Sequence, residues 1–366
     1  MIKKINKLIK FVFIYLSFFL VGDAIVSNFF LNTVIENNCY EWKKNFYELR
    51  KNCYAKEKWI KKSKSYKVYI DENGFRFDGK TKKNFDKNNT AIFFGGSFTY
   101  GMGAEYENSF VGLIEEEKKN YNILNLGVAG YSPSVFKYQL DELIKKNIFP
   151  KKIFLVLDIV DVNSEATNWD TVIGNYRPIN ITSIPDKENN EKKFKNFKRK
   201  NFKVTRIIST SINNYLRSLR YNFSKLNQKY KRPEKSQYGS FLFKDFKELD
   251  QNFWQPYGFE NAIIKITKAI KKIALKSREI NAEFYIIIYP WPDSLEYGQD
   301  KFNWENFAED LCNKNSCKEV INFFPDFEEI KKTSDNWVNK LFIEDDVHLT
   351  TFGHQIIAKK ILKNSF

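Results

Sequence analysis

The sequence predicts an α/β fold organised around a parallel, doubly wound sheet. From residue 91 onward, short apolar runs of strand type alternate with segments whose apolar residues recur at helical spacing. The run from Ile153 to Leu157 is apolar throughout, as expected of a strand that is buried on both faces. Strands that alternate with helices need crossover connections, and such connections favour parallel pairing.

The same patterns place each element along the chain. Strands are predicted at residues 92–94, 121–126, 153–157, 284–289 and around 319–322, and helices after residue 109, at 133–146, at 261–280, near 304–313 and at 351–363. Ser109 is expected to cap the first helix, and Pro133 opens the second, where a missing N–H costs nothing. Upstream, residues 66–77 are expected to form an edge strand with a turn at Asn73-Gly74, and residues 36–64 are compatible with a helix.

The N-terminus predicts a membrane anchor. Four lysines within the first ten residues precede an apolar run from Phe11 to Gly22, and apolar character resumes after Asp23. We therefore interpret residues 1–32 as a signal anchor, residues 33–85 as a stalk or cap, and residues 86–366 as the main domain on the extracytoplasmic side. A cleaved signal peptide and the buried N-terminal helix of a cytosolic protein are the alternatives.

Composition narrows the class of partner. The 366 residues carry a formal net charge of +16, which is compatible with nucleic acid, anionic membrane surfaces or acidic glycans. No zinc-finger spacing or other nucleic-acid signature accompanies this charge, so we expect no nucleic-acid partner. The four cysteines form two local pairs, Cys39 with Cys53 and Cys312 with Cys317, which suits disulfides in an oxidising compartment. Zinc ligation and unpaired thiols are the competing interpretations.

A long interruption separates the two halves of the predicted sheet. Residues 166–255 contain no further strand–helix unit. Within them, residues 191–203 mix lysine, arginine and phenylalanine, which is typical of a solvated loop and compatible with an anionic membrane surface. Residues 205–221 resemble an amphipathic helix, so the insertion is expected to form a partial lid over the sheet edge.

The stretch from Ala91 to Ala104 carries the first candidate for chemistry. An apolar strand ends in Gly95-Gly96, and Ser97 follows directly. A serine in this position exposes its hydroxyl at the sheet edge, above the following helix. The G-x-S-x-G nucleophile motif is not matched, because Thr99 stands in place of its last glycine. Taken alone, the pattern fits a phosphate-binding turn as well as a nucleophile.

The chain has two histidines, and one of them suits a general base. His348 lies just before the last predicted helix, with Asp345 three residues earlier. This D-x-x-H spacing lets the carboxylate hold the imidazole Nδ1 while Nε2 points elsewhere, as a Ser–His–Asp arrangement requires. A helix cap with an incidental histidine is the alternative. His354 lies inside the last helix and is expected to be structural.

Four ordered blocks resemble the SGNH (GDSL-type) hydrolase superfamily. These are Gly95-Gly96-Ser97, Gly130, a block around Asp161, and Asp345 with His348. The resemblance covers residues 73–366 apart from the insertion, and it implies a flavodoxin-like, three-layer α/β/α sandwich with strand order 2-1-3-4-5. It further implies Ser97 as nucleophile, His348 as general base and acid, and Asp345 as the orienting carboxylate. The backbone N–H groups of Ser97 and Gly130 would then form the oxyanion site, at the carboxyl ends of the strands.

The sequence departs from the family pattern at two blocks. Gly-Gly-Ser replaces Gly-Asp-Ser, and the third block begins at Asp158 and places Val160 where an oxyanion-binding asparagine is expected. One such donor is typically worth on the order of 10²–10³ in rate. Asn163 is a candidate substitute, and Asp158 and Asp161 are candidates for binding substrate hydroxyls. Trp291, in a rigid Pro-Trp-Pro loop at the same sheet edge, is a candidate for lining the site.

Together these features favour a membrane-anchored serine esterase or O-acyltransferase acting on small acyl esters, above all acetyl, of an envelope polysaccharide. Hydrolysis and transfer share the same acyl-Ser97 intermediate. No metal or organic cofactor is indicated. The expected partners are the acylated glycan, the membrane and, for transfer, a membrane-bound protein that donates the acyl group. A lipid esterase at the membrane surface and a non-catalytic glycan-binding or assembly protein are the alternatives.

Overall fold

The computed structural model describes most of the chain in two units. The described residues are 2–30, 38–42, 47–59, 64–80, 89–167, 169–170, 177–178, 201–205, 208–209, 212, 254, 257–299 and 302–366. One unit comprises residues 1–35 with 183–233, and the other comprises residues 36–182 with 234–366. Residues 36–85 therefore belong to the same unit as the main domain. Most of the predicted lid, and most of the Lys/Phe-rich segment, lie outside the described residues.

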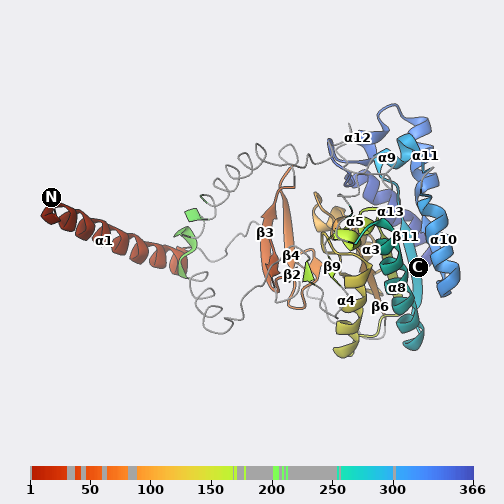
Figure 1. The fold of residues 1–366 in the computed structure, drawn as a ribbon, viewed down its shortest axis with the longest axis horizontal. Helices are drawn as coiled ribbons and strands as arrows, with labels where there is room; N and C mark the ends of the chain where they lie inside the picture. Colours follow the sequence, from red (N-terminus) through yellow and green to blue (C-terminus); the bar gives the residue numbers. More distant parts are fainter. Residues whose placement is uncertain are drawn as a thin grey trace. The chain divides into compact units, whose positions relative to one another are not determined.

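The first unit contains an apolar N-terminal helix. Helix α1 (Ile2–Ile25) continues into a π-helical turn, η1 (Val26–Phe30) (Figure 1). Its span Ile9–Phe29 has 21 residues with a mean hydropathy of 2.0. A helix needs about 20 apolar residues to cross a bilayer. The helix is thus long and apolar enough to be a membrane anchor or a signal sequence.

The carboxylate in this apolar helix has partners within the same unit. Asp23 accepts hydrogen bonds from the backbone N–H groups of Val204 (3.0 Å) and Thr205 (2.7 Å) and from the hydroxyl of Ser27 (2.7 Å). Val204 and Thr205 are helical, and Asp23 accepts the backbone N–H groups of both. Asp23 therefore ties the insertion to the end of the apolar helix.

The second unit is built on an eight-stranded sheet with the order β12-β11-β8-β6-β7-β5-β4-β3 (Figure 1). Its strands are β3 (Cys53–Glu57), β4 (Tyr66–Ile70), β5 (Arg76–Phe77), β6 (Thr90–Phe94), β7 (Asn122–Asn125), β8 (Lys152–Leu157), β11 (Glu283–Ile288) and β12 (Glu319–Asn322). The five strands from β12 to β7 pair in parallel. Counted along the chain, these five have the order 2-1-3-4-5, which confirms the expected flavodoxin-like topology.

Helices cover the parallel sheet in two groups. They are α2 (Ser97–Tyr100), α3 (Phe110–Glu117), α4 (Pro133–Lys145), α5 (Val160–Thr167), α8 (Phe259–Glu279), α9 (Pro292–Tyr297), α10 (Trp304–Asn315), α11 (Phe324–Thr333), α12 (Trp337–Leu341) and α13 (Thr351–Ser365), with a 3₁₀ turn η2 at Tyr106–Asn108. Helix α8 packs against α4, α5 and α10, whereas α13 packs against α3. As predicted, Ser109 caps α3 by accepting the N–H of Gly112 (3.2 Å), and Pro133 opens α4.

A row of aromatic rings holds the centre of the sheet. Phe93 of β6, Phe154 of β8 and Tyr285 of β11 stand opposite one another in the parallel register. The rings of Phe93 and Phe154 stack with centroids 4.5 Å apart, and those of Phe154 and Tyr285 with centroids 4.8 Å apart. These buried contacts fix the register of β6, whose carboxyl end carries Ser97.

The segment before the parallel sheet is β-structure, which corrects the helix expected for residues 36–64. Strands β1 (Tyr40–Trp42) and β2 (Tyr47–Leu49) pair with each other, and β3 joins the sheet through β4. Along β3, Cys53, Ala55 and Glu57 are buried while the residues between them are more exposed, which is the alternation of a strand rather than a helix. The predicted edge strand at 66–77 is instead the β4–β5 hairpin, and β3 forms the edge.

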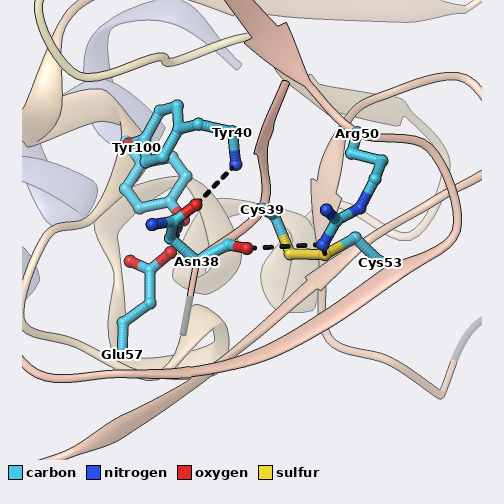
Figure 2. The surroundings of a disulfide bond; sticks show 7 residues. All are labelled: Asn38, Cys39, Tyr40, Arg50, Cys53, Glu57 and Tyr100. Carbon is cyan, nitrogen blue, oxygen red and sulfur yellow. Dashed lines mark hydrogen bonds between the residues drawn. A yellow bond between two sulfur atoms is a disulfide. The ribbon is translucent and has the colours of Figure 1, made fainter. Parts of the chain in front are cut away.

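Both predicted disulfides are present. Cys39 and Cys53 are joined with their Cα atoms 5.8 Å apart, beside the Arg50 side chain that donates to Cys53 Sγ (Figure 2). This bridge links the start of β3 to the residue that precedes β1. Cys312 and Cys317 are also joined, at the end of α10.

Candidate active site

Ser97 lies just beyond the carboxyl end of β6, which is the first of the parallel strands along the chain. Strand β6 ends at Phe94, Gly95-Gly96 makes the turn, and Ser97 begins α2. A Cβ on Gly95 would lie 2.0 Å from Thr99 Oγ1, so the turn leaves no room for a side chain there. Thr99 therefore packs onto the glycine turn. The structure thus places Ser97 directly after a glycine turn, as expected, and the serine is half-buried there.

His348 reaches this serine from the other end of the chain. The Nε2 atom of His348 lies 2.7 Å from Ser97 Oγ, within hydrogen-bond distance. On the opposite side of the ring, Nδ1 is hydrogen bonded to Asp346 Oδ1. The His348 side chain is buried, as is that of Asp346. A serine, an imidazole and a carboxylate thus stand in the order that a nucleophile, its base and the base's orienting group require.

The carboxylate of this triad is Asp346, not Asp345. Asp345 is exposed and has a left-handed backbone with φ of 60°, so it occupies a turn. The N–H of Asp346 donates to the carbonyl of Ile343 (2.9 Å), which closes a turn. This turn brings the Asp346 carboxylate to the Nδ1 atom of His348. Asp346 also accepts the backbone N–H of His348 (2.9 Å). The assignment of Asp345 from the D-x-x-H spacing was wrong by one residue. Two neighbouring aspartates precede His348, and the turn at Asp345 places the carboxylate of the second one, Asp346, against the imidazole.

A tryptophan that the sequence did not single out completes the carboxylate's surroundings. Trp59 Nε1 donates a hydrogen bond of 2.8 Å to Asp346 Oδ2. The same indole meets the His348 ring edge-on, with centroids 5.2 Å apart. Burial would raise the pKa of Asp346, but hydrogen bonds from His348 and Trp59 outweigh it, and the pKa is lowered. Asp346 is therefore held as an anion.

Aromatic rings surround the histidine on the side of the nucleophile helix. Phe98, the residue after the serine, stacks on His348 with centroids 4.8 Å apart. Its ring also contacts Tyr289 (4.4 Å) and lies 6.3 Å from the ring of Trp291. Trp291 is buried just before α9, so the predicted Pro-Trp-Pro loop lies near Phe98. That Trp291 lines a substrate site stays a prediction.

The loop that contains Gly130 runs beside the nucleophile turn. The carbonyl of Tyr131 lies 3.6 Å from the position of a Cβ on Gly96. Gly130 has φ of +80°, which glycine adopts without strain. The peptide between Ala129 and Gly130 is fixed, because Tyr47 Oη donates a hydrogen bond of 2.5 Å to the Ala129 carbonyl. Among the described residues, none accepts a hydrogen bond from the backbone N–H of Gly130 or from that of Ser97.

The acidic residues of the third block point into the protein. Asp158 accepts the Tyr289 hydroxyl (2.6 Å) and the N–H of Val160 (3.2 Å), and Asp161 accepts the N–H of Asp158 (2.9 Å). Both carboxyl groups are buried, and burial raises the pKa of each. Their placement does not support the expectation that they bind substrate hydroxyls; they fix the turn after β8 instead. Asn163 is half-buried on α5, one turn after Val160.

Residues before the parallel sheet hold the far end of the nucleophile helix. Arg76, fully buried on β5, donates to the carbonyls of Tyr100, Gly101 (2.8 Å) and Ala104 (2.5 Å). The buried carboxylate of Glu57 accepts the hydroxyl of Tyr100 (3.0 Å). Both side chains lie near the disulfide in Figure 2. Arg76 and Glu57, which lie on the strands before the parallel sheet, therefore hold the C-terminal end of helix α2 in place.

The second histidine is structural, as expected. His354 lies on α13, and its Nδ1 accepts the N–H of Phe110 (3.3 Å). Burial lowers its pKa to about 3, so the imidazole stays neutral. Among the described residues, no group of three or more His, Cys, Asp or Glu side chains is placed to hold a metal ion.

Comparison with known proteins finds likeness in solved structures. No family model and no curated protein matches the sequence. A lipolytic protein of the G-D-S-L family from Veillonella parvula is 14% identical, with 75% of this chain and 97% of that chain covered and a TM-score of 0.41. A catalytic mutant of Axe2, an acetylxylan esterase from Geobacillus stearothermophilus, is 10% identical, with 75% and 93% covered and a TM-score of 0.42. One fold hosts many activities, so the reaction of this chain has to be inferred from its site.

Proposed function

We propose that this chain is a serine esterase or O-acyltransferase of the SGNH type, acting on small acyl esters of an envelope polysaccharide. The observation that carries the proposal is the 2.7 Å contact between Ser97 Oγ and His348 Nε2, with Asp346 on the opposite imidazole nitrogen. A serine hydroxyl is a weak nucleophile unless an adjacent base removes its proton, and this geometry supplies that base.

Acylation follows from the positions of these three side chains. Ser97 Oγ attacks the ester carbonyl as His348 Nε2 accepts its proton. The imidazolium that forms is stabilised by the Asp346 anion at Nδ1. When the tetrahedral intermediate collapses, Nε2 returns the proton to the leaving alkoxide oxygen, and the acyl group remains on Ser97.

Deacylation uses the same base with a second hydroxyl compound. Water or a sugar hydroxyl gives its proton to His348 Nε2 and attacks the acyl carbon, and Ser97 leaves with the proton returned. Water gives hydrolysis, and a sugar hydroxyl gives transfer. In the second case a membrane-bound protein would supply the acyl group.

Two backbone donors suffice for the oxyanion, although Val160 stands in place of the family's asparagine. The free N–H groups of Ser97 and Gly130 belong to the two adjoining turns described above, and Tyr47 fixes the direction of the second. Serine proteases stabilise the corresponding oxyanion with two backbone N–H groups. The missing asparagine therefore argues for a slower enzyme more than for a non-catalytic protein.

An exposed tryptophan near the site, the apolar N-terminal helix and the two disulfides favour an ester of an envelope glycan as the substrate. Trp59 is 43% exposed beside His348, and exposed indole faces are well suited to pack on sugar rings. The apolar N-terminal helix and two disulfides suit a protein anchored in a membrane with its site in an oxidising compartment.

The test is ester hydrolysis by the full-length chain in detergent. We expect turnover of p-nitrophenyl acetate, loss of turnover to background in Ser97→Ala, and full turnover in the matched control Asp345→Asn. Equal turnover by the parent and Ser97→Ala would refute the assignment of the nucleophile.

Substrate competition separates the proposal from its alternatives. An acetylated oligosaccharide should give a higher kcat/KM than short-chain phospholipid esters. The opposite preference would favour the lipid esterase. Glycan binding without any ester turnover would favour the non-catalytic protein.

A further inference from the structure

We propose that Trp59 is a positioning residue, which holds the Asp346–His348 pair in the orientation that Ser97 needs. This inference rests on the proposed serine-ester chemistry. It makes the strands before the parallel sheet a required part of the catalytic apparatus.

The hydrogen bonds to Asp346 divide between its two oxygens. Oδ1 receives the His348 Nδ1 and the backbone N–H of His348. Oδ2 receives the Trp59 indole N–H, and no other described residue donates to it. Because His348 holds one oxygen and Trp59 holds the other, the carboxylate cannot rotate about its Cβ–Cγ bond without losing a hydrogen bond. Trp59 therefore fixes the plane of the group that fixes the imidazole.

The indole also restricts the imidazole directly. Its ring stands at 80° to that of His348, with centroids 5.2 Å apart. Phe98 contacts the same imidazole by stacking at 30°. An edge contact and a face contact together limit rotation of the histidine ring, which keeps Nε2 directed at Ser97. Phe98 lies on helix α2, and Trp59 lies in the segment that follows strand β3.

Trp59 is placed by an anchored strand rather than by the core. It follows β3 by two residues, and β3 pairs along its full length with β4. The strand's last residue, Glu57, accepts the hydroxyls of Tyr66 and Tyr100 (both 3.0 Å), and the disulfide ties its first residue, Cys53. Because the indole itself is 43% exposed, its removal should leave the core packing intact.

The experiment compares Trp59→Phe with the parent in the full-length chain. Phenylalanine keeps an aromatic ring but lacks the N–H. We expect kcat for p-nitrophenyl acetate to fall about tenfold, as for a lost hydrogen bond to a charged group, with KM unchanged within about twofold. Trp59→His, which restores a ring N–H, should recover part of the loss, and the unfolding midpoint should stay unchanged.

A double-mutant cycle with Asp346→Asn separates positioning from other functions of Trp59. If Trp59 acts through Asp346, Trp59→Phe should cost little or nothing once Asp346→Asn is present. A full tenfold cost in that background would overturn the proposal. A raised KM for p-nitrophenyl acetate at constant kcat would also overturn it, because this substrate has no sugar ring for the indole to pack on and the loss would then lie in binding rather than in positioning. An inactive parent chain would refute the proposed function, whereas an active parent matched by Trp59→Phe would refute only this inference.

Discussion

Replacing Asp346 by asparagine leaves one acceptor oxygen where three hydrogen bonds arrive. His348 provides two of these bonds to Oδ1, and Trp59 provides the third to Oδ2. If the amide oxygen faces His348, the amide NH₂ faces the indole N–H, and two donors oppose each other. If the amide flips, its NH₂ faces Nδ1, which must then accept. The imidazole proton is then forced onto Nε2, where Ser97 needs a base.

The expected loss in Asp346→Asn follows from this tautomer change. The same substitution in a serine-protease triad lowers kcat by about 10⁴. Since only one of the two amide orientations forces the wrong tautomer, we expect a loss of about 10³–10⁴ in kcat, or about 4–5.5 kcal/mol of transition-state stabilisation.

The control is the neighbouring Asp345→Asn. Asp345 is exposed with φ of 60°, a conformation that asparagine tolerates, so its kcat should stay within about twofold of the parent. The assay is p-nitrophenyl acetate hydrolysis at pH 7–8 by the full-length chain in detergent. Loss of activity in Asp345→Asn with retention in Asp346→Asn would refute the assignment drawn from the structure.

Three further perturbations test contacts of the site and of the surrounding fold. Tyr47→Phe frees the peptide that carries the Gly130 N–H, so kcat in the same assay should fall about 2- to 13-fold with KM constant; an unchanged kcat would exclude Tyr47 from oxyanion positioning. Cys39→Ser removes a bridge of sequence separation 14, so denaturant unfolding should show a stability loss of about 3 kcal/mol, and no loss would contradict the bridge. The Lys152 ammonium beside Glu283 lowers the carboxyl pKa to about 2. Because this folded-state pKa lies below the ordinary 4.5, the ion pair stabilises the fold above that pH, and its contribution is lost as pH falls toward 2. Its exposure limits the effect to about 1 kcal/mol, which Glu283→Gln should abolish in unfolding titrations across that range; an identical pH dependence in this variant would contradict it.

The parallel sheet and the position of Ser97 after a glycine turn could be predicted because their signals are local. Each parallel strand is a short apolar run, and Gly95-Gly96 predicts a tight turn before Ser97. The helix caps Ser109 and Pro133 are equally local, since they depend on side chains within one turn. The two disulfides could be predicted from the number of cysteines and the spacing between them alone.

The remaining parts of the site depend on contacts that sequence spacing does not encode. Trp59 lies 287 residues from Asp346, so nothing in either segment indicates the bond between them. The choice of Asp346 over Asp345 depends on one left-handed residue in a turn. The strands at residues 40–57 are three to five residues long and rich in charge, which gives too short a pattern to distinguish them from a helix.

The central claim, that His348 activates Ser97, can be tested directly with a fluorophosphonate, which reacts covalently with an activated serine. Peptide mass spectrometry of the labelled full-length chain should locate the adduct on Ser97. Labelling should be lost in His348→Ala, because the serine then has no base. No adduct on Ser97, or equally rapid labelling in His348→Ala, would contradict the account.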